Sequence, residues 1–461
     1  MYVYIYFIKE KNMKKYKVLT MALVLLFAAS LLFAVGGRQQ QDTTTPQSQL
    51  GMVVGSGSTR LIMYVNGPPT EDWLGYVWAQ LYARRNPNVS FEFRGSADNN
   101  THVTSIRLMA NTNSLPDIYV NGMSNAHEYA SMGVISDLTR AVEGDREWLN
   151  SFNPGVVDKW RINGRIYGIP FATDVQGWFF NKALFDRYNL PIPVTNDDFK
   201  RAITVFRQNG ILPIAHGGRD NWARWGYDPW FSRHGLSDVV RELDAGTLKF
   251  SDPRANITPV FERIKEWADL GAYPPNATTM GYTEAIELFR AGNAAMITTG
   301  QWELGGFTNP ELTRISNDIV FGWGPEFSGL RWDQKVGTKT QSWAFWVGKS
   351  LESRPDAYRA ALDFLKFVCS PEVARISVEQ YSHFPTVKVD LQGLRLQPLY
   401  ASMLEKSGDN YTAVPEFLDT QNFSDSSALI EPYWNSVTGV ITGTITPSEA
   451  VRLLDDWQAL R

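Results

Sequence analysis

The chain has 461 residues, of which 44% are hydrophobic and 20% charged, and its formal net charge is −4 at pH 7. This length predicts two or three core-forming units, since one domain commonly holds about 100–200 residues. The net charge is acidic and the chain has no long run of Lys or Arg. It therefore lacks the basic surface that binds nucleic acids or anionic membranes. We therefore expect no nucleic-acid partner.

The N-terminal segment has the pattern of a secretory signal peptide. Met13, a candidate translation start, opens a basic stretch, an apolar run over 18–33 follows, and small residues stand at Ala34 and Gly36. Cleavage at this point makes residues 1–36 the signal peptide. The alternative is an uncleaved membrane anchor, which is disfavoured because the apolar run is shorter than the ~20 residues that a span prefers. No Cys follows the run, so the sequence offers no lipobox, and we expect a soluble protein in the periplasm or otherwise exported.

Residues 37–59, rich in Gln, Thr, Ser and Gly, predict a flexible linker. The single cysteine, Cys369, lies on the apolar side of a predicted helix and is expected to be buried, without a disulfide partner. The five histidines are scattered, so we expect no metal site, and no motif calls for a cofactor. The chain also contains no P-loop and no Gly-x-Ser-x-Gly nucleophile elbow.

From Arg60 onward, strand-like and helix-like segments alternate. An apolar run over 61–65 ends in a turn at Asn66, a helix is predicted over 71–86, and residues 89–93 alternate as a strand. Strand, helix and strand of these lengths indicate a parallel βαβ unit and hence an α/β fold. The same pattern predicts strands at 117–120, 166–170 and 294–298 and helices at 283–291, 356–368 and 448–460, the last with the N-cap pattern Thr446, Pro447 and Glu449.

Four motifs carry a family resemblance. They are Leu115–Val120 followed by Gly133–Leu138, Gly164–Phe171 running on to Lys182, Phe289–Met296 ending at Trp302, and the helix Ala360–Val368 ahead of Ser370-Pro371-Glu372. In this order, and behind a signal peptide, they make the chain resemble the extracellular solute-binding proteins of ABC importers, in the branch that includes maltose- and oligosaccharide-binding proteins. The resemblance covers residues 60–461.

The resemblance implies a type II periplasmic-binding-protein fold, in which two α/β lobes enclose a ligand cleft. Crossovers are expected near 171–174, 327–330 and 384–386, which gives lobe one as 60–172 plus 328–384 and lobe two as 173–327 plus 385–461. Such a protein is a monomer and not an enzyme. It captures a mono- or oligosaccharide by lobe closure and delivers it to the permease subunits of an importer in the membrane.

A sugar site needs aromatic plates for the C–H faces of the ring and planar polar groups for its hydroxyls. The chain has 16 Trp, several of them in loops. Trp225 and Trp230 belong to an aromatic loop that is either a cleft wall or a small satellite core. The resemblance places Trp302 against a sugar, and Trp434 matches a second aromatic position, where core packing is an equal alternative.

The remaining candidates lie at the ends of predicted elements. Asn66 and Asn121 end strands, at the edge where α/β sheets bind ligands. Further candidates are Asp174 on the expected hinge, Tyr282 ahead of a helix, and Gln341 and Trp343 in a loop that precedes a strand. Some sugar binders of this branch carry an aromatic residue where this chain has Asn121, which favours a smaller ligand or one held by more hydrogen bonds.

Two alternatives remain open from the sequence. A secreted carbohydrate-active enzyme would also combine aromatic loops with carboxylates, although no catalytic pair of carboxylates is evident. The same fold also binds other solutes, such as a polyamine, a polyol, a metal complex or an oxyanion. The scattered histidines argue against the metal complex.

Overall fold

The computed structural model describes residues 52–461 apart from 68, 72, 97–98, 124–125, 342, 409–410, 420 and 425. The predicted signal peptide, residues 1–36, and most of the predicted linker lie outside the described residues. Within the described ranges, no helix is both long and apolar enough to cross a membrane.

The first sheet is mixed, with parallel strands at its centre. Parallel strands β2, β3 and β4 are extended on one side by β1 and on the other by β13 and β7, which pair antiparallel. The bounds, in spatial order, are β1 (Met52–Val54), β3 (Val89–Gly95), β2 (Thr59–Val65), β4 (Ile118–Asn121), β13 (Ala344–Val347) and β7 (Gly168–Pro170).

Helices cover both faces of this sheet, which explains its apolar strands. Ile118 and Val120 of β4 join one core, whereas Tyr119 between them joins the core on the opposite face. The first core takes in α2 (Leu74–Arg85), α5 (Thr139–Glu143), α6 (Arg146–Ser151), α14 (Pro355–Val368) and α15 (Pro371–Tyr381). The second core takes in α3 (Asn99–Asn111), α4 (Ala126–Ser131), the turn η1 (Asp158–Trp160) and β5 (Arg161–Ile162). The hairpin partner of β5, β6 (Arg165–Ile166), buries Ile166 in the first core.

The second sheet is built around β8 (Asp174–Asn181). Its neighbours are β12 (Val336–Thr340), with β14 (Thr412–Val414) beyond it, and β10 (Ala294–Gly300), with β9 (Leu212–Ala215) beyond; β11 (Ile319–Gly322) also pairs with β8. Alternate β8 residues face opposite cores, with Trp178 on one side and Phe179 on the other.

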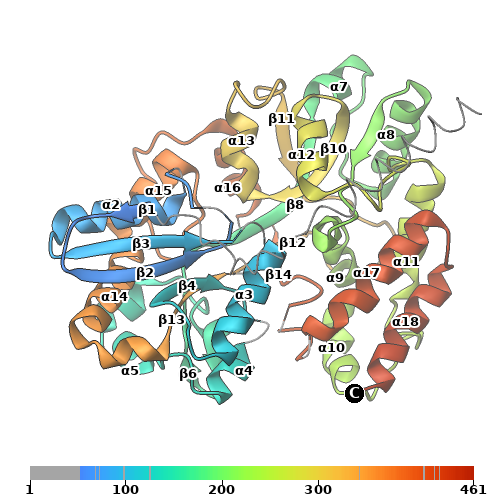
Figure 1. Cartoon of the computed structure of the whole chain (residues 1–461). Coiled ribbons are helices and arrows are strands. Elements are labelled where there is room, and N and C mark those ends of the chain that lie inside the picture. Colours follow the sequence, from blue (N-terminus) through green and yellow to red (C-terminus); the bar gives the residue numbers. More distant parts are fainter. Residues whose placement is uncertain are drawn as a thin grey trace, which may run out of the picture. The chain divides into compact units, whose positions relative to one another are not determined.

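Helices again cover both faces. The Trp178 side holds α7 (Lys182–Arg187), α8 (Asn196–Gln208), the turn η2 (Asn221–Gly226), α9 (Asp228–Arg233), α10 (Leu236–Asp244), α11 (Thr258–Asp269), α17 (Ser426–Thr442) and α18 (Pro447–Ala459). The Phe179 side holds α12 (Tyr282–Arg290), α13 (Leu304–Thr308) and α16 (Pro398–Lys406). In Figure 1, α11, α17 and α18 lie side by side. The capping box predicted at Thr446 starts α18, with Glu449 reaching back to the cap.

Two sheets, each with its own helices, give the two-lobed α/β architecture predicted from the sequence. The chain passes from the first sheet to the second between β7 and β8, where the first crossover is expected. It returns between β12 and β13, because β12 pairs with β8 in the second sheet. The expected crossover near 327–330 is therefore wrong, and the predicted start of the second lobe-one segment at 328 comes too early. The other lobe boundaries stay a prediction.

The predicted linker is also wrong at its C-terminal end. Residues 52–54 form β1, which pairs with β3 in the register Met52↔Phe93 and buries Val54, and β2 begins at Thr59. Three residues are too short a strand to leave a periodic signal, so local composition concealed this edge strand.

Candidate functional site

Three of the predicted aromatic residues meet at one end of β10. Trp302 follows this strand in the short turn η3 (Gln301–Glu303) and has 39% of its surface exposed. Its ring lies 4.6 Å from that of Trp225, at an interplanar angle of 62°. Tyr282 at the start of α12 packs edge-on against Trp225 at 6.0 Å. The three rings form what we call the aromatic platform (Trp225, Tyr282 and Trp302).

Hydrogen bonds orient two of the three platform rings, Tyr282 and Trp302. The Tyr282 hydroxyl accepts from Trp302 Nε1 at 2.8 Å, lies 2.6 Å from Thr299 Oγ1 and donates to Glu303 Oε1 at 2.8 Å. Glu303 in turn pairs with Arg290 at 2.9 Å. Burial raises the pKa values of both Tyr282 and Glu303. The exposed indole of Trp302 is thus held in place through its N–H, as a stacking surface requires.

A polar group lies next to the platform. Asp174, the first residue of β8, accepts a hydrogen bond of 2.9 Å from Gln301 Nε2, and Gln301 Oε1 accepts from the backbone N–H of Val175 at 2.8 Å. Sequence reasoning missed Gln301, although its place between Gly300 and Trp302 was a signal. Because Gln301 directly precedes Trp302, Asp174 and the platform belong to one site.

The candidates of the first lobe gather around His102. The strand-end residues Asn66 and Asn121 follow directly on Val65 and Val120, whose carbonyl oxygens both contact the His102 ring. The half-buried Trp343 packs edge-on against the same ring at 5.9 Å. The structure therefore brings together Asn66, Asn121 and Trp343.

These two groups lie on either side of one crossover. Asp174 pairs with Thr340 in the second sheet, and Asn121 pairs with Ala344 in the first. Thr340 and Ala344 are four residues apart, and a fully extended chain of that length spans at most about 14 Å. Gln341, half-buried, is part of this connection. Most predicted site residues thus lie near the passage between the sheets.

Two predicted aromatic residues lie in the core instead. Trp230 has no exposed surface and packs against Trp267 at 4.8 Å and Phe327 at 5.3 Å, so its prediction as a ligand contact is wrong. The physical reason is that the aromatic loop folds into η2 and α9, which turn Trp230 inward. Trp434 stacks on His216, donates to the Gly218 carbonyl at 3.1 Å and keeps 9% of its surface exposed. Contact between the solute and the exposed part of Trp434 stays a prediction.

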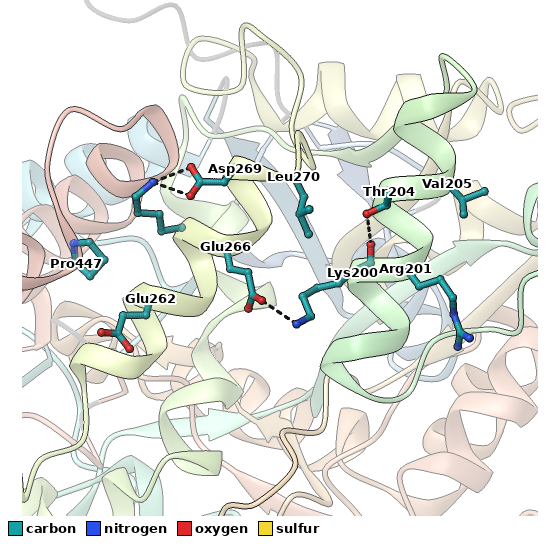
Figure 2. A pocket seen from close by; sticks show the side chains of 10 residues that line it. Lys200, Arg201, Thr204, Val205, Glu262, Glu266, Asp269, Leu270 and Pro447 are labelled. Atoms are coloured by element: carbon teal, nitrogen blue, oxygen red, sulfur yellow. Dashed lines mark hydrogen bonds and ion pairs between the residues drawn. The ribbon is translucent and has the colours of Figure 1, made fainter.

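A groove of about 700 Å³ lies elsewhere, between α8 and α11 and beside Pro447. Figure 2 shows Lys200 bound to Glu266 on the groove wall, at 2.8 Å, and Lys265 pairs with Asp269 at 2.7 Å. None of the predicted site residues lines it, and its walls offer ion pairs rather than aromatic plates. We therefore do not place the solute there. Among the described residues, no group of three or more His, Cys, Asp or Glu is arranged to hold a metal ion.

Comparison with known proteins decides the family. Residues 78–391 match the family model of the bacterial extracellular solute-binding proteins. The chain belongs to this family. The match covers well over half of the sequence and takes in most residues of both groups described above.

Curated relatives of this solute-binding protein match part of their length. A multiple sugar-binding protein of Streptococcus mutans is 24% identical over 233 residues, which are 48% of this chain and 53% of the relative. The melibiose/raffinose/stachyose-binding protein MelE of Bacillus subtilis is 23% identical over 310 residues, 64% of this chain and 66% of MelE. The chain thus spans about half to two thirds of the length of these relatives.

Solved structures share the fold of this solute-binding protein over nearly their whole length. A chitin oligosaccharide binding protein superposes with a TM-score of 0.75 at 21% identity, covering 87% of this chain and 98% of the other. Maltose-bound MalE3 of T. maritima gives a TM-score of 0.68 at 18% identity, with 87% and 99% covered. The type II periplasmic-binding-protein fold predicted from the sequence is confirmed.

Proposed function

We propose that this solute-binding protein is the high-affinity receptor of an ABC sugar importer, which captures a mono- or oligosaccharide between its lobes and delivers it to the permease subunits. The observation that carries the proposal is the aromatic platform, in which the partly exposed indole of Trp302 is held by the hydrogen bond from its N–H to the Tyr282 hydroxyl. The sugar-binding names of the relatives support the same solute class. The protein acts as an exported, soluble monomer without catalytic activity.

The platform favours a sugar over a polyamine. A polyamine site surrounds its cations with several carboxylates, whereas Glu303 next to the platform is already paired with Arg290 and Tyr282. An exposed Trp face instead offers stacking to the C–H surface of a sugar ring, and neighbouring side-chain amides offer hydrogen bonds to its hydroxyls. Asp174, Gln301, Asn66 and Asn121 are the polar residues that we assign to the hydroxyls.

A thermal-shift screen over mono- and oligosaccharides, polyols and polyamines tests the proposal. Tight binding raises the melting temperature, because a ligand at 100 times its Kd stabilises the native state by about 2.7 kcal/mol. We expect a shift with at least one saccharide and none with polyamines. Shifts with amines alone would contradict the sugar assignment, and release of product from a bound glycoside would support the enzyme alternative.

Substitution of Trp302 tests the site itself. Trp302→Ala should abolish the saccharide shift while leaving the unliganded melting temperature nearly unchanged, because the side chain is partly exposed. A matched control is Trp332→Ala, since Trp332 is also incompletely buried and donates its indole N–H to Asp238 at 2.8 Å, in a loop outside the platform. Retained binding by Trp302→Ala, or equal loss in the control, would refute the stacking role.

A further inference from the structure

His102 occupies an unusual position at the edge of the first sheet. It lies on α3 with no exposed surface, and both ring nitrogens contact backbone carbonyl oxygens. Nδ1 is 3.1 Å from the oxygen of Val65, and Nε2 is 2.6 Å from that of Val120. Because a carbonyl oxygen can only accept, each contact requires a proton on the ring.

The two carbonyls belong to neighbouring strands at the place where their pairing ends. β2 and β4 pair in parallel through Met63↔Ile118 and Tyr64↔Tyr119. Val65 and Val120 are the next residues on each strand, so the imidazole joins the strands one step beyond their last paired residues. Where the pairing of β2 with β4 stops, the His102 side chain of α3 thus takes the place of the next contact between the two strands.

The residues beyond this cross-link are the polar candidates of the first lobe. Asn66 follows Val65, and Asn121 follows Val120, which puts each one peptide unit away from a carbonyl that His102 holds. Tyr64, a titratable neighbour, stacks on one face of the ring at 5.3 Å, and Trp343 packs edge-on at 5.9 Å. One imidazole therefore contacts the elements that carry three proposed site residues.

The position of the proton on the His102 ring depends on where the ends of β2 and β4 lie. Neutral imidazole has one N–H and one lone pair, so it satisfies one carbonyl at a time, and only the doubly protonated ring satisfies both. The pKa of His102 is lowered, because burial outweighs the opposing effect of the contacts with Val120 and Val65, and this favours the neutral ring. A shift of either strand end changes the balance between the two ring nitrogens, which is a signal that spectroscopy can read.

We propose that His102 is a positioning residue of the solute site, which sets Asn66, Asn121 and Trp343 relative to one another without contacting the solute. The inference rests on the proposed function and goes beyond it, because it assigns the affinity of the first lobe to a buried residue behind the site. The ring nitrogens of His102 then respond to solute binding, and removal of these nitrogens loosens the two strand ends.

Calorimetric titration with a saccharide that binds the wild type tests the inference. His102→Phe keeps an aromatic ring between Tyr64 and Trp343 but removes both nitrogens, and we expect affinity to fall at least tenfold. His102→Gln supplies an amide with two N–H donors and should recover part of that loss. A matched control is His234→Phe, because His234 is also buried and bonds one carbonyl, that of Trp230 at 2.7 Å, in the second lobe. The control should bind like the wild type.

Nitrogen-15 NMR of the imidazole rings gives a second readout on the wild type, where only five histidines contribute signals. Saturation with the saccharide should shift both ring nitrogens of His102 and leave those of His234 in place. This measurement decides the question even if His102→Phe fails to fold.

The inference is overturned by wild-type affinity in His102→Phe, by an equal loss in His234→Phe, or by His102 nitrogens that do not move on binding. Failure of the proposed function looks different. If the wild type binds no saccharide, the proposed function and the inference fall together. If the wild type binds and Trp302→Ala does not, the proposed function stands and the histidine results alone judge the inference.

Discussion

A buried ion pair links the cores of the two lobes. Lys159 Nζ lies 2.6 Å from Asp419 Oδ2 and donates to Thr340 Oγ1 at 2.7 Å. The two charged side chains are only 8% and 5% exposed. Lys159 precedes Trp160 in a core of the first sheet, whereas Asp419 follows Leu418 in a core of the second. We predict that Lys159→Met destabilises the protein by about 3–5 kcal/mol, because it leaves a buried carboxylate without its counter-charge.

The geometry sets this magnitude. At 2.6 Å and an effective dielectric constant of about 20, the attraction between the two charges is about 6 kcal/mol. Removing each ion from water costs several kcal/mol, so the pair as a whole adds little net stability. The single substitution forfeits the attraction but keeps the desolvation of Asp419, which explains why it is costly. Lys159→Met combined with Asp419→Asn removes both charges, and the amide oxygen still accepts from the Gln421 N–H, so most of the loss should be recovered.

Urea unfolding followed by circular dichroism measures these differences. A matched control is Lys366→Met, because Lys366 lies 2.7 Å from Asp145 but the two side chains are 40% and 33% exposed. We expect the control to cost about 0–1 kcal/mol, as exposed pairs usually do. The reasoning is refuted if Lys159→Met costs no more than the control, or if the double variant is less stable than the single one.

Three further predictions follow from single contacts. Burial lowers the pKa of His216 to about 3, so the wild type loses stability as the pH falls from about 6.5 toward 3, where the unfolded chain binds a proton that the native state does not. Between pH 7 and pH 5, the free energy of unfolding in urea should fall by about 2 kcal/mol less in His216→Phe than in the wild type. Equal falls in both proteins would contradict this. Gly218→Ala would place Cβ 2.6 Å from the Ala277 carbonyl oxygen, so it should destabilise the protein by about 1–3 kcal/mol and lower its melting temperature. An unchanged melting temperature would show that the loop moves to accommodate the methyl group. Tyr282→Phe removes the acceptor of the Trp302 indole and should weaken saccharide binding about fivefold in calorimetry, less than Trp302→Ala does; no change would mean that packing alone holds the indole.

Much of the fold and part of the site could be predicted from the sequence. Alternating strands and helices indicated the α/β class, because the period of apolar residues records which faces of an element are buried. The capping pattern at Thr446 was read correctly, since a cap depends on residues three positions apart. Trp225 was named because aromatic side chains in loops lack a local packing explanation, and Tyr282 because it stands ahead of a predicted helix. Trp302 was named because the family resemblance places it against a sugar, and the role of all three in binding stays a prediction.

Other features could be decided only by the tertiary structure. Trp230 lies in the same aromatic loop as Trp225, but contacts with Trp267 and Phe327, which come from distant segments, bury its ring completely. The assignment of β12 to the second sheet depends on pairing with β8, more than 150 residues away, which leaves no trace in local periodicity. His102 stands in a helix with no conspicuous motif. Its place between two carbonyls exists only once two strands and that helix are packed together, because a side chain's partners are set by contacts between distant segments and not by its neighbours along the chain.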